Sequence, residues 1–360
     1  MLERLLAPLL ETLRPHFDLS KTRLETLAVL LFGLANCRTV NLSHLASQFP
    51  GCAKHGSNYR RLQRFFQHIR LDGDVAALVI MQMLNLRNRP NVLALDRTNW
   101  KLGSRDINIL VLAIVTRRFR VPLMWTLLDH GGNSGTPERI ALMDRYLRLF
   151  GASSIRTLLA DREFVGTEWM HFLNKNNVPF AIRIKEDMVI HLADGTRRQF
   201  RTLLRKPKRG NWEGWLNGME ARPEDRLRVA GKRIDGELLT VATNMEKAEK
   251  GLDLYRKRWG IECMFGDAKT RGFNIEDTHI TDPKKLASLL VIVALAVTWA
   301  YRCATCVMGR GNIRKKRHGR REKSWFRTGL DALRKWIIHQ PEKAIDAWAK
   351  TCPRRHVTTS

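Results

Sequence analysis

The stretch from Tyr255 to Lys269 concentrates residue types that bind metal ions and phosphates. It contains no proline, and its apolar residues recur at helical spacing, so we expect a helix. At about 100° per residue, the side chains of Tyr255, Arg258, Glu262 and Lys269 share a stripe roughly 60° wide. A carboxylate on a rigid helix suits a metal ion, while Arg, Lys and Tyr beside it suit a phosphate. The apolar residues are expected on adjoining surfaces: Leu254, Trp259, Ile261 and Phe265.

The same charge mixture also fits a solvated, salt-bridged helix, so this stretch needs support from acids elsewhere. Two acids follow short apolar runs that read as strands. Asp96 comes directly after Val92–Leu95, and Asp161 directly after Ile155–Ala160. An acid at the end of a buried strand is exposed at the rim of a sheet, where a ligand can reach it.

The elements around these acids follow a recognisable order. We expect two further strands at 107–115 and 121–128, joined by a charged turn at Arg117–Arg120. After a flexible loop at 130–135, a helix capped by Thr136 runs to Phe150. The strand ending at Asp161 is followed by a helix at 166–177 and a strand at 178–184. Three antiparallel strands, then helix, strand, helix and strand, is the order of the ribonuclease-H-like α/β fold.

In that fold the strands ending at Asp96 and Asp161 are neighbours, and a helix packed across the sheet can bring Glu262 to the same rim. Three converging carboxylates cannot all ionise cheaply unless cations bind among them. A pair of Mg²⁺ ions is the usual solution where a phosphodiester is cut.

The charge of the whole chain points to a polyanion. Its 360 residues carry a formal net charge of +28 and a pI near 10.6. Nucleic acid is the first candidate for a partner, and an anionic membrane surface is the second. The apolar run Leu286–Tyr301 is short for a membrane span and is expected to be a buried core helix. The N-terminus lacks signal-peptide organisation and the six cysteines form no disulfide framework, so we expect a cytoplasmic protein.

The N-terminal region reads as helical and could hold a DNA-reading module. Ser57 is a candidate N-cap for a helix ending at His68. On that helix Arg60, Arg61 and Arg64 are expected to project outward. Helix, turn and basic helix is a common DNA-binding arrangement, although a small helical bundle with a charged surface explains the pattern equally well.

Two further segments are strongly basic. Between the last core strand and the opening helix lies a β-rich segment with Arg197, Arg198, Arg201 and Arg205–Arg209. Trp212 and Trp215 are expected in its Gly/Asn-rich loop, where they would contact unpaired DNA or simply pack. A second run, from Arg310 to Lys323, fits either phosphate contact or a solvated segment. We therefore expect four parts: a helical DNA-binding domain at 1–88, a catalytic core at 89–184 and 244–305, a β-rich insertion at 185–243, and a basic helical region at 306–360.

Three motifs together resemble a known family. Asp96-Arg97-Thr98-Asn99-Trp100, Asp161-Arg162-Glu163-Phe164 and Tyr255-x2-Arg258-x3-Glu262-x6-Lys269 are similar to bacterial insertion-sequence transposases of the DDE class with the Tyr-Arg-Glu-Lys signature. The first two motifs are short, whereas the third is specific, and the resemblance spans roughly residues 90–305.

The resemblance implies a DNA transposase that cuts a mobile element at its ends and joins it to target DNA. It assigns Asp96, Asp161 and Glu262 as catalytic ligands of two Mg²⁺ ions, with Mn²⁺ able to substitute. Tyr255, Arg258 and Lys269 would hold the DNA-end phosphate. It further implies double-stranded DNA as partner, a homodimer on DNA, no membrane, and a nucleoid-associated bacterial protein.

One departure concerns base flipping. Relatives that form a DNA hairpin intermediate stack a flipped base on a Trp shortly before this helix. The matching stretch here, Glu237–Thr243, contains no Trp. Trp212 or Trp215 is therefore the candidate substitute, or the base-flipping detail differs. Two alternatives share parts of this evidence. One is a metal-dependent nuclease of the same fold without strand transfer, and the other is a DNA-binding protein that does not catalyse.

Overall fold

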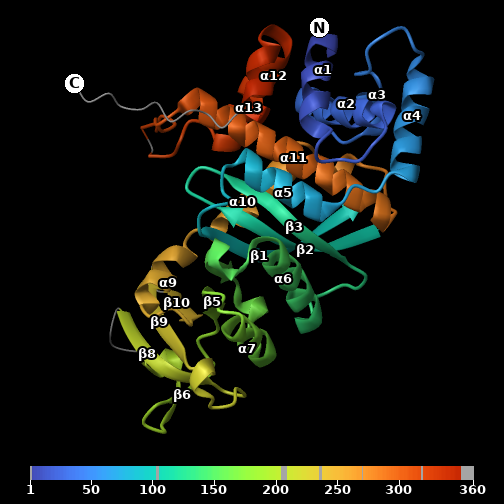
Figure 1. The fold of residues 1–360 in the computed structure, drawn as a ribbon. Coiled ribbons are helices and arrows are strands. Elements are labelled where there is room, and N and C mark those ends of the chain that lie inside the picture. Colours follow the sequence, from blue (N-terminus) through green and yellow to red (C-terminus); the bar gives the residue numbers. More distant parts are fainter. Residues whose placement is uncertain are drawn as a thin grey trace. The chain divides into compact units, whose positions relative to one another are not determined.

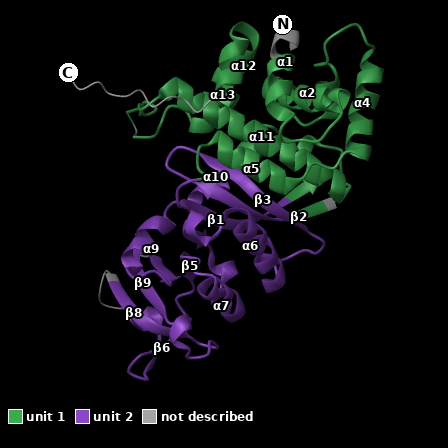
Figure 2. Cartoon of the chain, in the orientation of Figure 1, with its two compact units in different colours: residues 1–87, 100–107, 264–360 green, residues 88–99, 108–263 purple. Residues whose placement is uncertain are grey.

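The computed structural model describes residues 2–102, 105–203, 209–234, 237–269, 271–317 and 319–349. The chain divides into two compact units, shown in Figure 2. Unit 1 consists of residues 1–87, 100–107 and 264–360, and unit 2 of residues 88–99 and 108–263.

The described strands form one ten-stranded mixed sheet, and Figure 1 labels most of them. Its order is β3-β2-β1-β4-β5-β10-β9-β8-β6-β7. β1 pairs in parallel with β4, and β4 in parallel with β5, whereas β2–β3 and β5–β10 are antiparallel. The strands are β1 (Asn91–Leu102), β2 (Arg105–Val115), β3 (Arg120–Leu128), β4 (Ile155–Ala160), β5 (Phe180–Ile184), β6 (Val189–Leu192), β7 (Arg197–Gln199), β8 (Arg209–Leu216), β9 (Leu227–Ile234) and β10 (Glu237–Thr243).

The centre of the sheet is covered on both faces, which explains its continuous apolar runs. Leu158, Leu159 and Ala160 of β4 are all fully buried, as expected for a central parallel strand. α6 (Thr136–Phe150) packs against β3 and against α7 (Thr167–Lys175). α9 (Ala248–Tyr255) packs against β4, β5, β9 and β10. The predicted order of strands and helices in the core is confirmed. The prediction that the first strand ends at Leu95 was wrong, because β1 continues to Leu102 and Asp96 lies within it.

The segment at 185–243 is β-rich, and its strands extend the same sheet, since β10 pairs with β5 along Thr240–Thr243. The prediction of a loop around the two tryptophans was wrong, because Trp212 and Trp215 both lie within β8, which is paired on both sides. The predicted basic run at 205–208 lies outside the described residues.

Unit 1 is built around α11 (Pro283–Met308), whose residues Leu286–Ala304 are buried almost without interruption. α2, α4, α5, α12 and α13 all contact it. By length and composition α11 could cross a membrane, but 94% of its apolar window is buried inside the protein. The predicted buried core helix is thereby confirmed. The other helices of the unit are α1 (Leu2–Leu13), α2 (Lys21–Cys37), α3 (Leu42–Ala46), α4 (His55–His68), α5 (Gly73–Met83), α12 (Trp325–His339) and α13 (Pro341–Ala349).

Two predicted helix caps were displaced. α4 begins at His55 with Lys54 as N-cap, so Ser57 lies inside the first turn, where its backbone N–H donates to the Lys54 carbonyl. α6 begins at Thr136 with Gly135 as N-cap, whose N–H donates to Glu138 Oε2 at 2.6 Å. In the C-terminal region, the basic run precedes α12 and is not helical where described; residues 350–360 lie outside the described part.

Candidate active site

The stretch predicted as one helix is broken in the structure. α9 ends at Tyr255 and α10 (Trp259–Ala268) begins four residues later, with Arg258 in the intervening turn. The turn is tight: Arg258 N–H donates to the Tyr255 carbonyl and Ile261 N–H to the Arg258 carbonyl, each three residues back. The prediction of one unbroken helix was therefore wrong, although Tyr255, Arg258 and Glu262 still come together on one side.

Gly260 permits the close approach of α10 to the sheet. A Cβ atom at this position would lie 2.4 Å from Val115 Cγ1 on β2 and 3.0 Å from Arg120 Nε on β3. Real side chains cannot come so close, so only glycine fits here without displacing its neighbours. Since Glu262 follows two residues later, this contact fixes where its carboxylate emerges.

Asp96 lies within β1 and Asp161 directly follows β4, at corresponding places beside the ladder that joins these strands. The parallel ladder between β1 and β4 ends with Leu95 opposite Ala160, and the two acids are the next residues. Each carboxylate accepts a 2.8 Å hydrogen bond from the following backbone N–H, that of Arg97 or Arg162. In both acids this contact uses Oδ1.

The three predicted acids gather around the guanidinium of Arg258. Its Nη1 lies 3.0 Å from Asp96 Oδ2, and its Nη2 lies 3.7 Å from Asp161 Oδ2. Nη2 also pairs with Glu262 Oε1. The Arg258 side chain is only 12% exposed, so a single enclosed cation neutralises part of a cluster of three carboxylates.

The electrostatics of this cluster follow from burial. Burial raises the pKa of Asp96 to about 6, although Arg258 pulls the other way, and the charges of Asp161 and Glu262 add to the rise. Burial lowers the pKa of Arg258, but Tyr255 and the three acids outweigh it and raise that pKa overall. The acids thus need positive charge nearby, and the guanidinium supplies it here.

Tyr255 and Lys269, the other two residues of the motif, have different surroundings. The hydroxyl of Tyr255 donates to Asp161 Oδ1 at 3.1 Å, and burial, with the nearby Asp161, raises the pKa of this phenol. Lys269 follows α10 and belongs to unit 1, where its Nζ pairs with Glu276 at 3.1 Å. Tyr255 is thus joined to the acid cluster directly.

A second ion pair ties the two acid-bearing segments together, and sequence reasoning missed it. Arg97 follows Asp96, and its Nε donates to Glu163 Oε1 at 3.1 Å, two residues after Asp161. Arg97 Nη1 also donates to the buried Asn108 Oδ1 at 3.2 Å. The Asn108 amide in turn donates to the carbonyls of His130 and Gly132. The sequence contained a signal for this ion pair, because the basic Arg97 directly follows Asp96 and the acidic Glu163 follows Asp161 by two residues.

Trp259 lies next to this site and is the most exposed of the large apolar side chains described. Its side chain is 63% exposed, whereas Ile261 is fully buried and Phe265 is nearly so. The break before α10 turns this indole outward, beside Arg258 in the chain.

A different group of residues brings metal-ligand atoms closest together in the described part of the chain. Asp129, His130 and Glu138 have ligand atoms within 4.8 Å of one another. Asp129 and His130 lie in the loop that follows β3, and Glu138 lies in the first turn of α6, with its Oε1 2.9 Å from His130 Nε2. Sequence reasoning placed only a flexible loop here.

The predicted DNA-facing arginines of α4 divide into two kinds. Arg60 and Arg64 are exposed. Arg61 instead donates to Glu25, to Thr26 Oγ1 and to the Thr22 carbonyl, and its guanidinium stacks over Phe49. Arg61 therefore joins α4 to α2 rather than projecting outward.

The two predicted tryptophans of β8 also differ. Trp215 Nε1 donates to the Arg222 carbonyl at 2.8 Å, and the Arg226 guanidinium lies over its ring. Trp212 is half-buried, with its ring folded over Gly210. Trp215 thus has the contacts of a packed side chain.

The large mixed sheet with its helices is consistent with the ribonuclease-H-like fold of DNA-processing enzymes, and the three carboxylates meet beside the end of the parallel β1–β4 ladder. The family model described as Transposase DDE domain matches residues 87–299, more than half of the chain. The chain therefore belongs to this family, the DDE transposases, and DNA is its partner. No curated protein matches the chain.

Proposed function

We propose that this protein cuts an insertion sequence at its ends and joins it to target DNA, with Asp96, Asp161 and Glu262 as the catalytic acids. The observation that carries the proposal is their convergence on Arg258, since residues distant in the sequence meet around one enclosed cation. A structural ion pair needs one acid for one arginine, whereas three acids exceed what Arg258 neutralises.

The same acids fit a divalent metal site. All their ligand atoms are carboxylate oxygens, which Mg²⁺ prefers, and burial disfavours the ionised form of Asp96 unless positive charge lies beside it. We assign two Mg²⁺ ions to them, with Mn²⁺ able to substitute. When bound, such ions would supply an activated water or 3′-hydroxyl and positive charge for the leaving oxygen.

The remaining residues of the motif would position the DNA end. Arg258 offers a guanidinium that can bind a phosphate through two hydrogen bonds, and Tyr255 offers one hydroxyl. Lys269 is assigned to the same phosphate, as a point charge. Arg97 and Glu163 would act as positioning residues, since their ion pair links the segments that carry Asp96 and Asp161.

Trp259 is the best-placed aromatic residue for a base that leaves the stack near the cut. Its exposed indole adjoins Arg258 in the chain, and base–aromatic stacking contributes about 1–3 kcal/mol per base. Trp212 is the second candidate, and Trp215 is disfavoured because the Arg226 guanidinium already lies over a face of its ring.

The other parts of the chain are assigned to DNA binding and assembly. We propose residues 1–88 and 306–360 as DNA-binding regions flanking the catalytic core, 185–243 as a basic insertion, and a homodimer on DNA. With a net charge of +28, association with the bacterial nucleoid in the cytoplasm is expected.

Incubation with the DNA that flanks its own gene, in the presence of Mg²⁺, tests the proposal. Mapping should find cuts at the element's ends, followed by joining of each 3′-OH to a second DNA, and the Glu262→Gln protein should give neither. Cutting without joining would favour the nuclease alternative. An Asp96→Asn protein as active as the parent would favour a DNA-binding protein without catalysis.

A further inference from the structure

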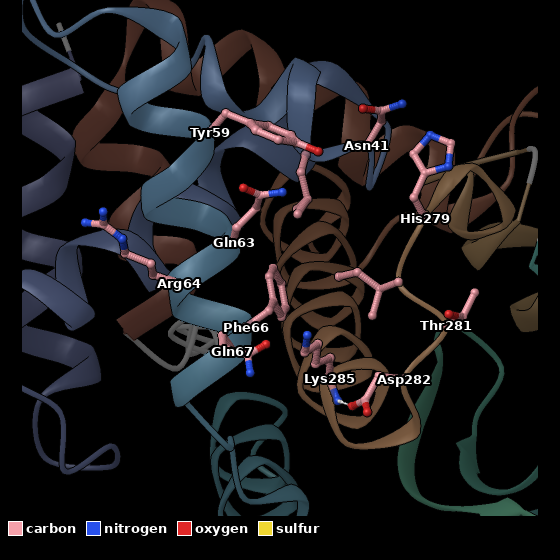
Figure 3. A pocket seen from close by; sticks show the side chains of 12 residues that line it. Asn41, Tyr59, Gln63, Arg64, Phe66, Gln67, His279, Thr281, Asp282 and Lys285 are labelled. Atoms are coloured by element: carbon pink, nitrogen blue, oxygen red, sulfur yellow. Dashed lines mark hydrogen bonds between the residues drawn. The ribbon is translucent and has the colours of Figure 1, made fainter.

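A cavity of about 500 Å³ lies beside α4, between that helix and the segment 279–285 that leads into α11 (Figure 3). Both walls belong to unit 1. Figure 3 shows Gln63 and Tyr59 on α4 facing the wall that carries His279 and Thr281. Lys285 closes the lower end in that view, while the Arg64 guanidinium turns away.

The walls are fixed by hydrogen bonds around the cavity. Leu71 N–H, just beyond α4, donates to the buried Ser288 Oγ of α11 at 3.1 Å. The Thr39 hydroxyl, before α3, donates to Asp277 Oδ2 at 2.6 Å. Asp282 is the N-cap of α11, and its Oδ1 accepts a 2.8 Å hydrogen bond from the backbone N–H of Lys285. The cavity is therefore preformed, and its one acid has a structural partner.

The lining combines three kinds of chemistry. Asn41, Gln63 and Gln67 carry carboxamides, which offer a donor and an acceptor side by side, as the edge of a nucleobase requires. The rings of Tyr59 and His279 provide faces on which a base can stack. The Lys285 ammonium supplies a positive charge for a phosphate.

The shape of the cavity decides between a duplex and a single nucleotide. A duplex presents its base edges in a groove, and a convex helix reads them by entering that groove. A cavity of about 500 Å³ instead has the size of a small-ligand site, which can enclose one nucleotide. We propose that this cavity binds one unpaired nucleotide, with its base between the carboxamides and its phosphate at Lys285. The inference rests on the proposed DNA-binding function, and the nucleotide comes either from a DNA strand or free from solution.

Fluorescence anisotropy with full-length protein tests the inference. The probes are a labelled duplex with one unpaired nucleotide, the fully paired duplex, and unlabelled deoxynucleoside monophosphates as competitors. The parent should bind the bulged duplex about 10-fold more tightly, as expected from one stacked base. Lys285→Gln and Gln63→Leu should each remove most of that preference.

The matched control is Lys284→Gln, which makes the same charge change on the adjacent, exposed residue outside the lining. It should keep the preference. If monophosphates bind the parent but not Lys285→Gln, and no bulge preference exists, the site takes free nucleotides. The proposal is overturned if the parent shows neither effect, or if the Lys284 and Lys285 variants behave alike. If the cavity binds no nucleotide but the protein still cleaves paired DNA at the element's ends, only the cavity proposal is contradicted and the proposed function is not.

Discussion

The acid cluster contains three residues of the motif, Glu262, Arg258 and Tyr255, and we expect each side chain to have a different role. Glu262→Gln keeps the shape and removes one metal-ligand charge, so cleavage should fall by several orders of magnitude while binding of the element's end persists. Tyr255→Phe loses one hydrogen bond, to Asp161, and should be the mildest change. A gel-shift and a cleavage assay run in parallel would compare the variants. Normal cleavage by Glu262→Gln would mean that the cluster is structural.

Arg258→Ala should have an effect that depends on metal. Without the guanidinium, three carboxylates lie together uncompensated, so the metal-free protein should lose about 1–3 kcal/mol of stability. Mg²⁺ or Mn²⁺ should then raise the melting temperature more in the variant than in the parent. The matched control is Arg256→Ala, which removes an exposed arginine two residues earlier. Equal metal stabilisation in both proteins would contradict the assignment of the acids as ligands.

The pH dependence of metal binding follows from Asp96. Its pKa is raised to about 6 by burial, so a proton competes with a cation for this carboxylate near that pH. Affinity for Mn²⁺, measured by calorimetry, should therefore rise between about pH 5 and about pH 7.5. Asp96→Asn should bind more weakly and lose much of this pH dependence. A pH-independent affinity in the parent would count against Asp96 as a ligand.

At the scale of elements, the packing of α10 against the sheet is the sensitive point. Gly260→Ala forces a methyl group into Val115, which should cost about 1–3 kcal/mol and shift Glu262, lowering cleavage more than DNA binding. Gly56→Ala in α4 is the matched control, because a Cβ atom there meets nothing within 4 Å. That variant should be neutral or slightly stabilised, since Ala favours a helix. Thermal unfolding and cleavage of both proteins provide the comparison.

The convergence of the three acids was predictable from the sequence because local signals mark each of them, whereas their catalytic role stays a prediction. Asp96 and Asp161 each end an apolar run whose strand character is readable, and Glu262 has a specific motif around it. The break before α10 was missed because no proline marks it and the tight turn depends on packing against β2 and β3. The Arg61 side chain was likewise predicted to project outward, because nothing in its own helix indicates that it pairs with Glu25 and stacks over Phe49.

At the scale of the whole molecule, charge should dominate DNA binding. With a net charge of +28, many Lys and Arg side chains can contact phosphates, so affinity should fall by orders of magnitude between about 50 and about 200 mM salt. Arg60→Gln should reduce the slope of log affinity against log salt by about one. Arg61→Gln should instead lower stability, because that side chain bonds within the protein. A nearly flat salt dependence would mean that the charge serves another partner.

The position of Arg258 also has a thermodynamic consequence. The guanidinium cannot pair with Asp96 and Glu262 and, at the same time, give the same N–H groups to a DNA phosphate. Metal ions that neutralise the acids would release it for DNA, and DNA that captures it would vacate the acids for metal. Each ligand then raises the affinity for the other by the same factor, because coupling between two binding events is reciprocal. The state with both ligands bound would thus be favoured over either half-loaded state, and a single side chain would couple the two binding events.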